Sequence, residues 1–275
     1  MRKIGYILLL LLSALRMNAQ IGGENIYDFL QFPTSARMEA LGGGLQSIKN
    51  TTDADLSLAI ANPALLDSSF HKQLSLSNAF YTDKTNIGNI SYAHYQPKIK
   101  TIFAYTMQYA SYGQFDGRDA AGNATGTFRA ADFNFQVGMG RHWNRFYYGV
   151  NVKFILSHLE TYNSIGLATD VALGYHDAKK GWTAAVVLRN AGAELKTYTP
   201  ETGRQKLPLQ LDMTFSKRFK RLPLTLSVTA HNLQTWDLSY PETSSQTIVL
   251  GTQKKKGKGS EVMDNLFRHV AFGAE

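Results

Sequence analysis

Cysteine is absent from the 275-residue sequence, and proline occurs only seven times. Without cysteine there are no disulfides, thiol nucleophiles or cysteine-based metal sites, so a core or a membrane must hold the folded chain together. Long apolar runs are also missing: beyond the first residues, no segment approaches the roughly 20 apolar residues of a transmembrane helix. If the chain crosses a membrane, we expect closed β-strands to do so.

The motifs of common catalytic sites are missing as well. Neither HExxH nor GxSxG occurs in the sequence. The stretch 251–260 resembles a phosphate-binding loop, but its spacing is wrong and Gly259 stands where a serine or threonine is needed. His142, His176 and His231 are expected near strand ends or on polar faces, where hydrogen bonding is an ordinary role for histidine. The sequence therefore predicts a protein that is not an enzyme and holds no cofactor or metal.

The N-terminus has the layout of a secretory signal peptide. Arg2 and Lys3 form a charged start, an apolar run covers residues 4–12, and Ala19 supplies a small residue for cleavage. A transmembrane helix is the alternative, but this run is too short for a hydrocarbon core of about 30 Å, and Arg16 interrupts its far end. We predict that residues 1–19 direct export.

Segments of about ten residues alternate between apolar and polar side chains with the period of two that is typical of β-strands. In residues 132–142, an apolar set is interleaved with polar or small residues. That apolar set is Phe133, Phe135, Val137 and Met139. The pattern recurs around residues 103–110, 164–176, 209–216 and 224–229. The chain is therefore predicted to be all-β and antiparallel.

Alternation alone would also suit a soluble β-sandwich, which has one buried and one wet face. Two features favour a membrane barrel. The polar sets are rich in small and uncharged residues, as expected for a crowded lumen, in which Lys153, Asp170 and Arg189 are expected to pair with one another. Aromatic residues also gather near strand ends, as in the interfacial girdles of outer-membrane barrels. These are Tyr81, Tyr95, Tyr109, Trp143, Phe146, Tyr147, Tyr148, Tyr175, Trp182 and Trp236.

The lengths of the connections give an independent criterion. Ten strands are predicted, at 73–81, 88–96, 99–111, 131–143, 146–158, 164–176, 181–190, 208–219, 222–234 and 265–275. Tight turns at 97–98, 144–145, 177–180 and 220–221 alternate with longer connections at 82–87, 112–130, 159–163, 191–207 and 235–264. Short periplasmic turns opposite long extracellular loops are typical of outer-membrane barrels. We therefore predict that residues 72–275 form an antiparallel β-barrel integral to a Gram-negative outer membrane.

The segment 20–71, between the signal peptide and the barrel, has a different texture. Thr34 or Ser35 can cap a short helix that ends before Gly42-Gly43, and residues 53–66 predict a second short helix broken at Asn62-Pro63. Two such helices could plug or line the periplasmic mouth of the barrel. A loosely ordered lead-in is the alternative.

Several motifs, taken together, resemble one family. They are "QIGGENIYDFLQFPTSARMEALGG" from Gln20, "NPALL" from Asn62, "VKFILSHLETYNSIGLATD" from Val152, "VVLRNAGAELKTY" from Val186 and "LSVTAHNLQTWDLSY" from Leu226. In this order and spacing they resemble the PorQ family, outer-membrane barrels of the type IX secretion system of Bacteroidota. The triplet Asn62, Pro63 and Ala64 is less specific by itself, because it is shared with PorV and with fatty-acid-transporter-like barrels.

The resemblance implies a fourteen-stranded barrel with a helical N-terminal segment, of which about ten strands are present here. The last segment, 267–275, still alternates and does not end on an aromatic residue. Either this is a ten-stranded barrel or the C-terminal strands are missing. We expect the second, a C-terminally truncated barrel that does not close. Functionally, the resemblance implies a membrane anchor for the cell-surface attachment complex, with PorZ as direct partner and PorU and PorV as companions.

Three functions are weighed: a docking scaffold, a conduit for hydrophobic small molecules, and an outer-membrane enzyme. A polar lumen disfavours the conduit, and the lack of a catalytic constellation disfavours the enzyme. Nucleic acid is not an expected partner, because no exposed aromatics interleave with the lysines at 254–258. Docking is expected on the long loops. The candidate contact residues there are Tyr112, Asp116, Lys196, Tyr198, Trp236, Lys254, Lys255 and Lys256.

Overall fold

The computed structural model describes residues 25–40, 55–81, 84–201, 203–236, 238 and 258–274. The predicted signal peptide, Gly42-Gly43 and the lysines at 254–256 lie outside these residues. Within the described parts of the chain, no helix is long and apolar enough to cross a membrane.

Ten antiparallel strands form one sheet, in which each strand pairs with its neighbours in the sequence. All ten predicted strands are therefore present, and the all-β class is confirmed. The strands are β1 (Leu74–Phe80), β2 (Asn86–Gln96), β3 (Thr101–Arg118), β4 (Ala124–Trp143), β5 (Phe146–Leu159), β6 (Tyr162–Asp177), β7 (Trp182–Lys196), β8 (Gln210–Arg218), β9 (Thr225–Ala230) and β10 (Val270–Ala274).

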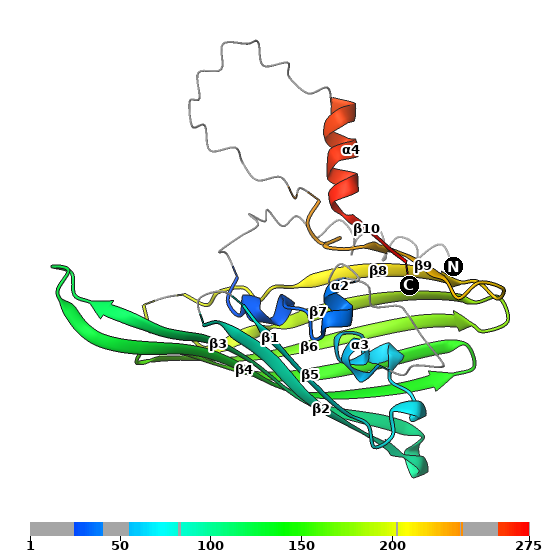
Figure 1. Ribbon diagram of the computed structural model, residues 1–275, viewed down its shortest axis with the longest axis horizontal. Coiled ribbons are helices and arrows are strands. Elements are labelled where there is room, and N and C mark those ends of the chain that lie inside the picture. Colours follow the sequence, from blue (N-terminus) through cyan, green and yellow to red (C-terminus); the bar gives the residue numbers. More distant parts are fainter. Residues whose placement is uncertain are drawn as a thin grey trace, which may run out of the picture.

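The sheet curves into an open trough (Figure 1). In the described part of the chain, β1 and β10 each pair on one side only, so these strands form the two edges of the sheet. This agrees with the expectation that the ten strands do not close a barrel. Adjacent strands twist with the usual right hand, and the long central strands β3 to β7 form the floor of the trough.

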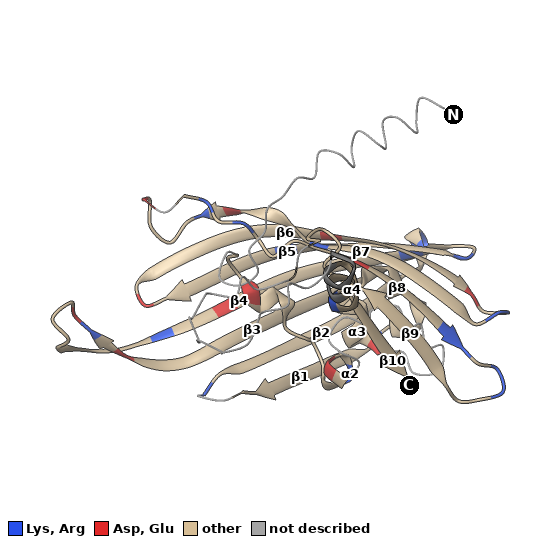
Figure 2. Cartoon of the chain, turned by 90° about the horizontal axis from the view of Figure 1, so that it is seen from above, with Lys and Arg blue, Asp and Glu red and all other residues tan. Residues whose placement is uncertain are grey.

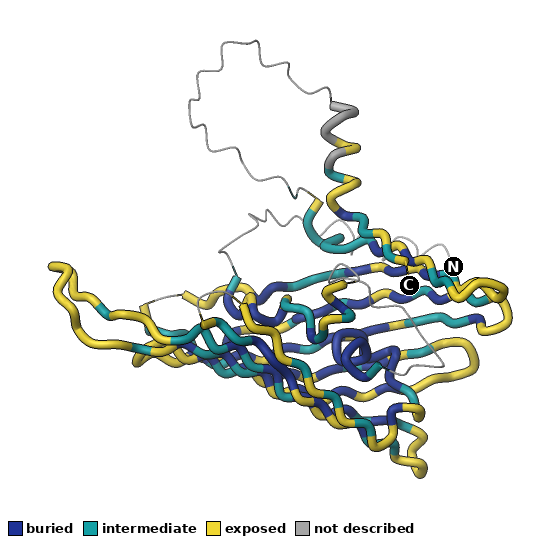
Figure 3. The backbone as a smooth tube through the Cα atoms, in the orientation of Figure 1, coloured by how far each residue is buried: buried dark blue, intermediate teal, exposed yellow. Residues whose placement is uncertain are grey.

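In a soluble protein the exposed face of a sheet is polar and its buried face is apolar. In this sheet the two faces are reversed. Along β4, the outward side chains Phe135, Val137 and Met139 are each at least 44% exposed, whereas Asn134 and Gln136 between them are buried. The period-two alternation therefore places apolar residues outside and polar residues inside. Figure 3 shows that burial is concentrated in the middle of the trough, while the strand ends are exposed.

Short helices of the N-terminal segment lie on the concave side of the sheet (Figure 1). They are η1 (Asp28–Gln31), α2 (Ala36–Ala40), α3 (Leu56–Ala61), η2 (Pro63–Leu65) and η3 (Ser68–Phe70). Two further helices lie elsewhere in the chain: η4 (Pro97–Ile99) forms the turn between β2 and β3, and α4 (Lys258–Arg268) precedes β10. Both predicted helices are present. Ser35 Oγ accepts a hydrogen bond from the Met38 amide at the start of α2, and Asp55 Oδ1 accepts one from Ser57 at the start of α3.

The prediction of a long loop at 112–130 is wrong. The strands β3 and β4 continue past the rest of the sheet as a projecting hairpin, which closes through a turn at 119–123. A bulge beside Ser111 allows this continuation, because Gly113 there adopts a φ of 83° that other residues rarely tolerate. The carboxylate of Asp119 accepts hydrogen bonds from the amides of Ala121 and Asn123 and fixes the turn.

Other predicted boundaries also need correction, and β9 covers only Thr225–Ala230 of the predicted 222–234. Residues 159–163 form a tight turn at Glu160-Thr161 rather than a loop, and β7 extends to Lys196. Residues 265–268 belong to α4, so the last strand begins only at Val270. The alternating stretch at residues 265–275 is too short to distinguish the end of a helix from the start of a strand.

Candidate functional site: an inner face occupied by the N-terminal segment

Two buried ion pairs lie on the concave face of the sheet. Lys153 Nζ is 2.8 Å from Asp170 Oδ1, and Arg189 Nη2 is 2.9 Å from Asp212 Oδ2. Both carboxylate side chains are fully buried. The expected pairing of Lys153 with Asp170 is confirmed, and the partner of Arg189 is Asp212, which the sequence pattern did not single out.

The carboxylate of Asp170 is the centre of a wider network. Besides Lys153, it accepts hydrogen bonds from Asn151 Nδ2 at 2.9 Å and from the amide of Asn190 at 2.8 Å. Lys153 Nζ also donates to Asn190 Oδ1 at 2.7 Å. A buried charge is tolerated when its remaining hydrogen-bonding positions are satisfied in this way. The network joins β5, β6 and β7 from the inside.

The same inner face binds the end of helix α3. The carbonyl oxygen of Ile60 accepts hydrogen bonds from Gln136 Nε2 and Asn151 Nδ2, each at 3.0 Å. Carbonyl groups at the end of a helix have no partner within it, so side chains of the sheet complete the helix. Asn62 Oδ1 then accepts from the Ala64 amide at 3.1 Å, which caps η2. The Asn62-Pro63-Ala64 triplet is thus a turn that connects α3 to η2 on the sheet.

Glycines on β4 and β5 allow this turn to approach the sheet closely. A Cβ atom at Gly149 would overlap the Pro63 carbonyl and lie 2.8 Å from the Ala64 nitrogen. One at Gly140 would lie 2.7 Å from the carbonyl oxygen of Leu66. The triplet therefore lies directly on the backbone of the sheet, which only glycine permits at such distances. We call the three residues and the two glycines the plug contact.

The start of the N-terminal segment makes a second set of contacts. The hydroxyl of Tyr27 shares a hydrogen bond with Ser164, and its ring lies over Gly166. The Ile26 amide donates to the Lys206 carbonyl at 2.9 Å, and Asn89 Nδ2 donates to the Thr34 carbonyl at 2.5 Å. Burial raises the pKa of Tyr27 to about 12, so the hydroxyl keeps its proton at neutral pH. The described parts of the N-terminal segment, residues 25–40 and 55–71, therefore form a packed plug of the trough rather than a loose lead-in.

The predicted docking residues fall into two groups. The hydroxyls of Tyr112 and Tyr198 turn inward: Tyr112 donates to Asp132 Oδ2 at 2.6 Å, and Tyr198 shares a hydrogen bond with Ser157. Burial raises the pKa of Tyr198, which is a sign of its enclosed position.

Asp116, Lys196 and Trp236, by contrast, are exposed at the end of the sheet opposite the tight turns. Trp236 stacks on His269, with ring centroids 5.7 Å apart. Lys254, Lys255 and Lys256 lie outside the described residues.

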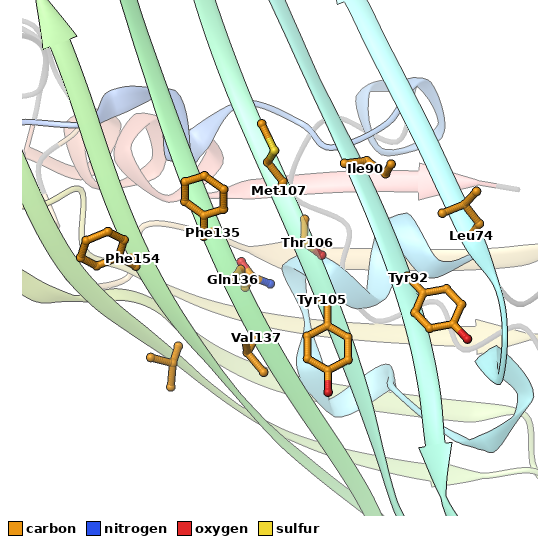
Figure 4. A pocket seen from close by; sticks show the side chains of 11 residues that line it. Leu74, Ile90, Tyr92, Tyr105, Thr106, Met107, Phe135, Gln136, Val137 and Phe154 are labelled. Atoms are coloured by element: carbon orange, nitrogen blue, oxygen red, sulfur yellow. The ribbon is translucent and has the colours of Figure 1, made fainter.

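An apolar hollow of about 570 Å³ lies on the outward face, across β1 to β5. Figure 4 shows its side chains projecting from neighbouring strands. They include Leu74, Ile90, Tyr105, Met107, Phe135, Val137 and Phe154. The alternation in the sequence assigns these residues to one face, but only the register between strands brings them together.

In the part of the chain that the structure describes, no group of three or more His, Asp or Glu residues could hold a metal ion. His176 Nδ1 lies 2.9 Å from Thr183 Oγ1, which is the hydrogen-bonding role expected for a histidine at a strand end. Comparison with protein-family models and with curated proteins gives no match for this chain.

The plug contact predicts the effect of a single methyl group. We expect Gly149→Ala to destabilise the protein by about 1–3 kcal/mol, because the new Cβ atom forces the Pro63 turn off the sheet. Thermal unfolding in detergent, followed by circular dichroism, measures the change. Gly203→Ala is the matched control, since nothing lies within 4 Å of its Cβ position. Equal stability of the two variants would show that the turn does not need this close approach.

The inner network predicts strong coupling between its two charges. Asp170→Asn leaves the Lys153 ammonium buried without a countercharge, and such a loss costs about 3–5 kcal/mol. Adding Lys153→Met to this variant removes the stranded charge and is expected to restore part of the stability. Unfolding free energies of the two single variants and the double variant form a thermodynamic cycle. Additive effects would mean that the two residues do not act as a pair.

Proposed function

We propose that this chain is an outer-membrane β-barrel component of the type IX protein secretion system. In this proposal it anchors the attachment complex at the cell surface, with PorZ as direct partner and PorU and PorV as companions. The observation that carries the proposal is the inverted sheet, apolar outside and polar inside, with its inner face occupied by the plug. The secretion system itself is inferred from the sequence motifs that resemble the PorQ family.

The outward face supports a membrane location. Large apolar side chains cover it from β1 to β9, among them Leu76, Phe154, Leu173 and Met213, each at least 42% exposed. A soluble protein rarely leaves an apolar surface of this extent in contact with water. Lipid hydrocarbon would cover it without cost, and the alternating inward residues would stay inside the barrel.

The occupied inner face supports a scaffold rather than a conduit. Several of the side chains that would line a passage are hydrogen-bonded to the plug, as Gln136 and Asn151 are to Ile60. The apolar hollow over β1 to β5 favours the alternative, uptake of hydrophobic small molecules. However, it opens on the outward face, so a molecule bound there would remain outside the wall of the barrel.

The projecting hairpin of β3 and β4 is a candidate for docking a surface partner. Its strands pair up to the turn at 119–123, and Phe115 stacks on Phe128 with ring centroids 5.3 Å apart. Both strands outrun their outer neighbours, because β2 pairs only as far as Ser111 and β5 only as far as Ala130. The hairpin therefore presents unpaired strand edges, which can accept an extended segment of another protein.

A charged substitution tests the membrane location. We expect Val137→Lys, at the centre of the outward face of β4, to destabilise the inserted protein by about 2–4 kcal/mol, because an ammonium group would lie in hydrocarbon. Gln114→Lys on the projecting hairpin is the control. Unfolding in vesicles and the amount recovered in the outer-membrane fraction are the measurements. Equal tolerance of the two substitutions would indicate that the outward face does not contact lipid.

Deletions test partner docking. In a full-length version of the protein, we expect removal of residues 235–264 to release the surface partner while the barrel still inserts. Replacement of residues 114–128 by an Asn-Gly turn separates the role of the hairpin from that of the 235–264 connection. Pull-down of the tagged protein from outer membranes, followed by quantification of PorZ, is the measurement.

The expected result is at least a tenfold loss of PorZ with one of these deletions. Replacement of the 219–224 turn at the opposite end by the same Asn-Gly turn should retain it. Wild-type recovery of PorZ with both loop variants would count against docking on this end of the sheet, and recovery of lipid alone from the unaltered protein would favour the transport alternative.

A further inference from the structure

The tight turns at one end of the sheet carry only positive charge. They join β2 to β3, β4 to β5, β6 to β7 and β8 to β9; the residues between these strands include no Asp or Glu, and Asp177, the last residue of β6, is an acidic residue at their border. Figure 2 shows Lys and Arg residues in the turns at this end of the strands. The basic residues of these turns, which we call the basic rim, are Lys98, Lys100, Arg145, Lys179, Lys180, Lys220 and Arg221.

Most of the rim has no ion-pair partner in the described residues, and Asp177 is the acidic group that acts on Arg145 and Lys180. Arg145 pairs with Asp177 at 3.1 Å, and Asp177 also accepts a hydrogen bond from the Lys180 amide at 3.1 Å. The other six side chains are exposed, and none of them forms an ion pair with a carboxylate of the described residues. Successive turns lie two strands apart, which is about 10 Å. This equals the Debye length of about 10 Å at 0.1 M salt, so the fields of the turns overlap.

A band of outward aromatic residues borders the rim. Phe146 and Tyr175 are in contact, with ring centroids 5.5 Å apart, and Trp182 and Phe215 are 4.7 Å apart. Trp143, next to Phe146 in the register, is 75% exposed. The band is therefore continuous with the apolar outward face on one side and with the basic rim on the other.

The opposite end of the sheet has no such bias. Its connections contain acidic residues, namely Asp119, Glu160 and Glu201, together with basic ones. Because both ends belong to one chain with a formal net charge of +8, the overall charge does not explain why acids are missing from one end only. The asymmetry is a property of the short-turn end.

We propose that the basic rim binds the anionic headgroups of phospholipids in the membrane leaflet at the short-turn end. This inference rests on the membrane location argued under Proposed function. An amphiphile with a negative head and an apolar tail matches the rim and the aromatic band at the same time. An acidic protein would match only the charges and would leave the outward rings against lipid. In an outer membrane the short turns face the periplasm, so the leaflet is the phospholipid one.

Lipid selectivity of the reconstituted full chain tests the proposal. The protein is placed in vesicles of phosphatidylcholine, and the association of spin-labelled phosphatidylglycerol is compared with that of spin-labelled phosphatidylcholine. We expect a preference of about fivefold or more for phosphatidylglycerol, which falls as salt is added, since basic residues at a membrane surface attract anionic lipid.

Two variants with the same change in charge locate the effect. The rim variant should lose the preference; it carries Lys98→Gln, Lys100→Gln, Lys179→Gln, Lys180→Gln, Lys220→Gln and Arg221→Gln. The control variant should keep it; it carries Lys84→Gln, Arg118→Gln, Arg129→Gln, Lys196→Gln, Arg204→Gln and Lys206→Gln, all exposed at the opposite end. The salt dependence of the unaltered protein provides a readout that needs no substitution.

Three outcomes would overturn the proposal. Equal loss in both variants would show an effect of net charge alone, and an unchanged preference in the rim variant would place the lipid elsewhere. Absence of any preference in the unaltered, inserted protein would assign the rim to an acidic protein instead, while the proposed membrane location would stand. Failure of the chain to insert into vesicles would reject both.

Discussion

The contact between the Ile60 carbonyl and the amide side chains of Gln136 and Asn151 is the interaction on which the interior depends. A buried polar inner face must find partners for its hydrogen-bonding groups, because an unsatisfied buried group costs about 1–3 kcal/mol. The plug supplies backbone carbonyls as those partners. In return, the sheet completes helix α3, which is too short to be stable in isolation.

The close approach of the plug explains why small residues recur on the inner face. Gly140 and Gly149 leave room for the Pro63 turn, and Gly166 leaves room for the ring of Tyr27. Beside the plug, the inner face carries charged residues that pair across strands, such as Lys153 with Asp170. The plug and the ion-paired side chains thus both fill the inner side of the sheet, and both restrict the space available for a passing molecule.

The ends of the strands differ as clearly as the faces of the sheet. At one end, tight turns carry a basic rim beside a band of aromatic rings; at the other, β3 and β4 project as a hairpin with unpaired edges. In the proposed function, the first end would meet the membrane surface and the second a protein partner. The connections are sorted into these two ends because the strands form a simple meander, in which every second connection lies at the same end.

Local patterns in the sequence determined the all-β class, the positions of the ten strands and the two short helices, since alternation and helix caps are properties of neighbouring residues. They also indicated that Lys153 and Asp170 share a face. The 112–130 segment was harder, because the Gly113 bulge lets strands continue through residues that resemble a loop. Only the tertiary structure decided that the plug occupies the trough, that Arg189 binds Asp212 and that Tyr112 turns toward Asp132. These contacts join residues far apart in the chain, and their geometry depends on strand register, which no short stretch of sequence specifies.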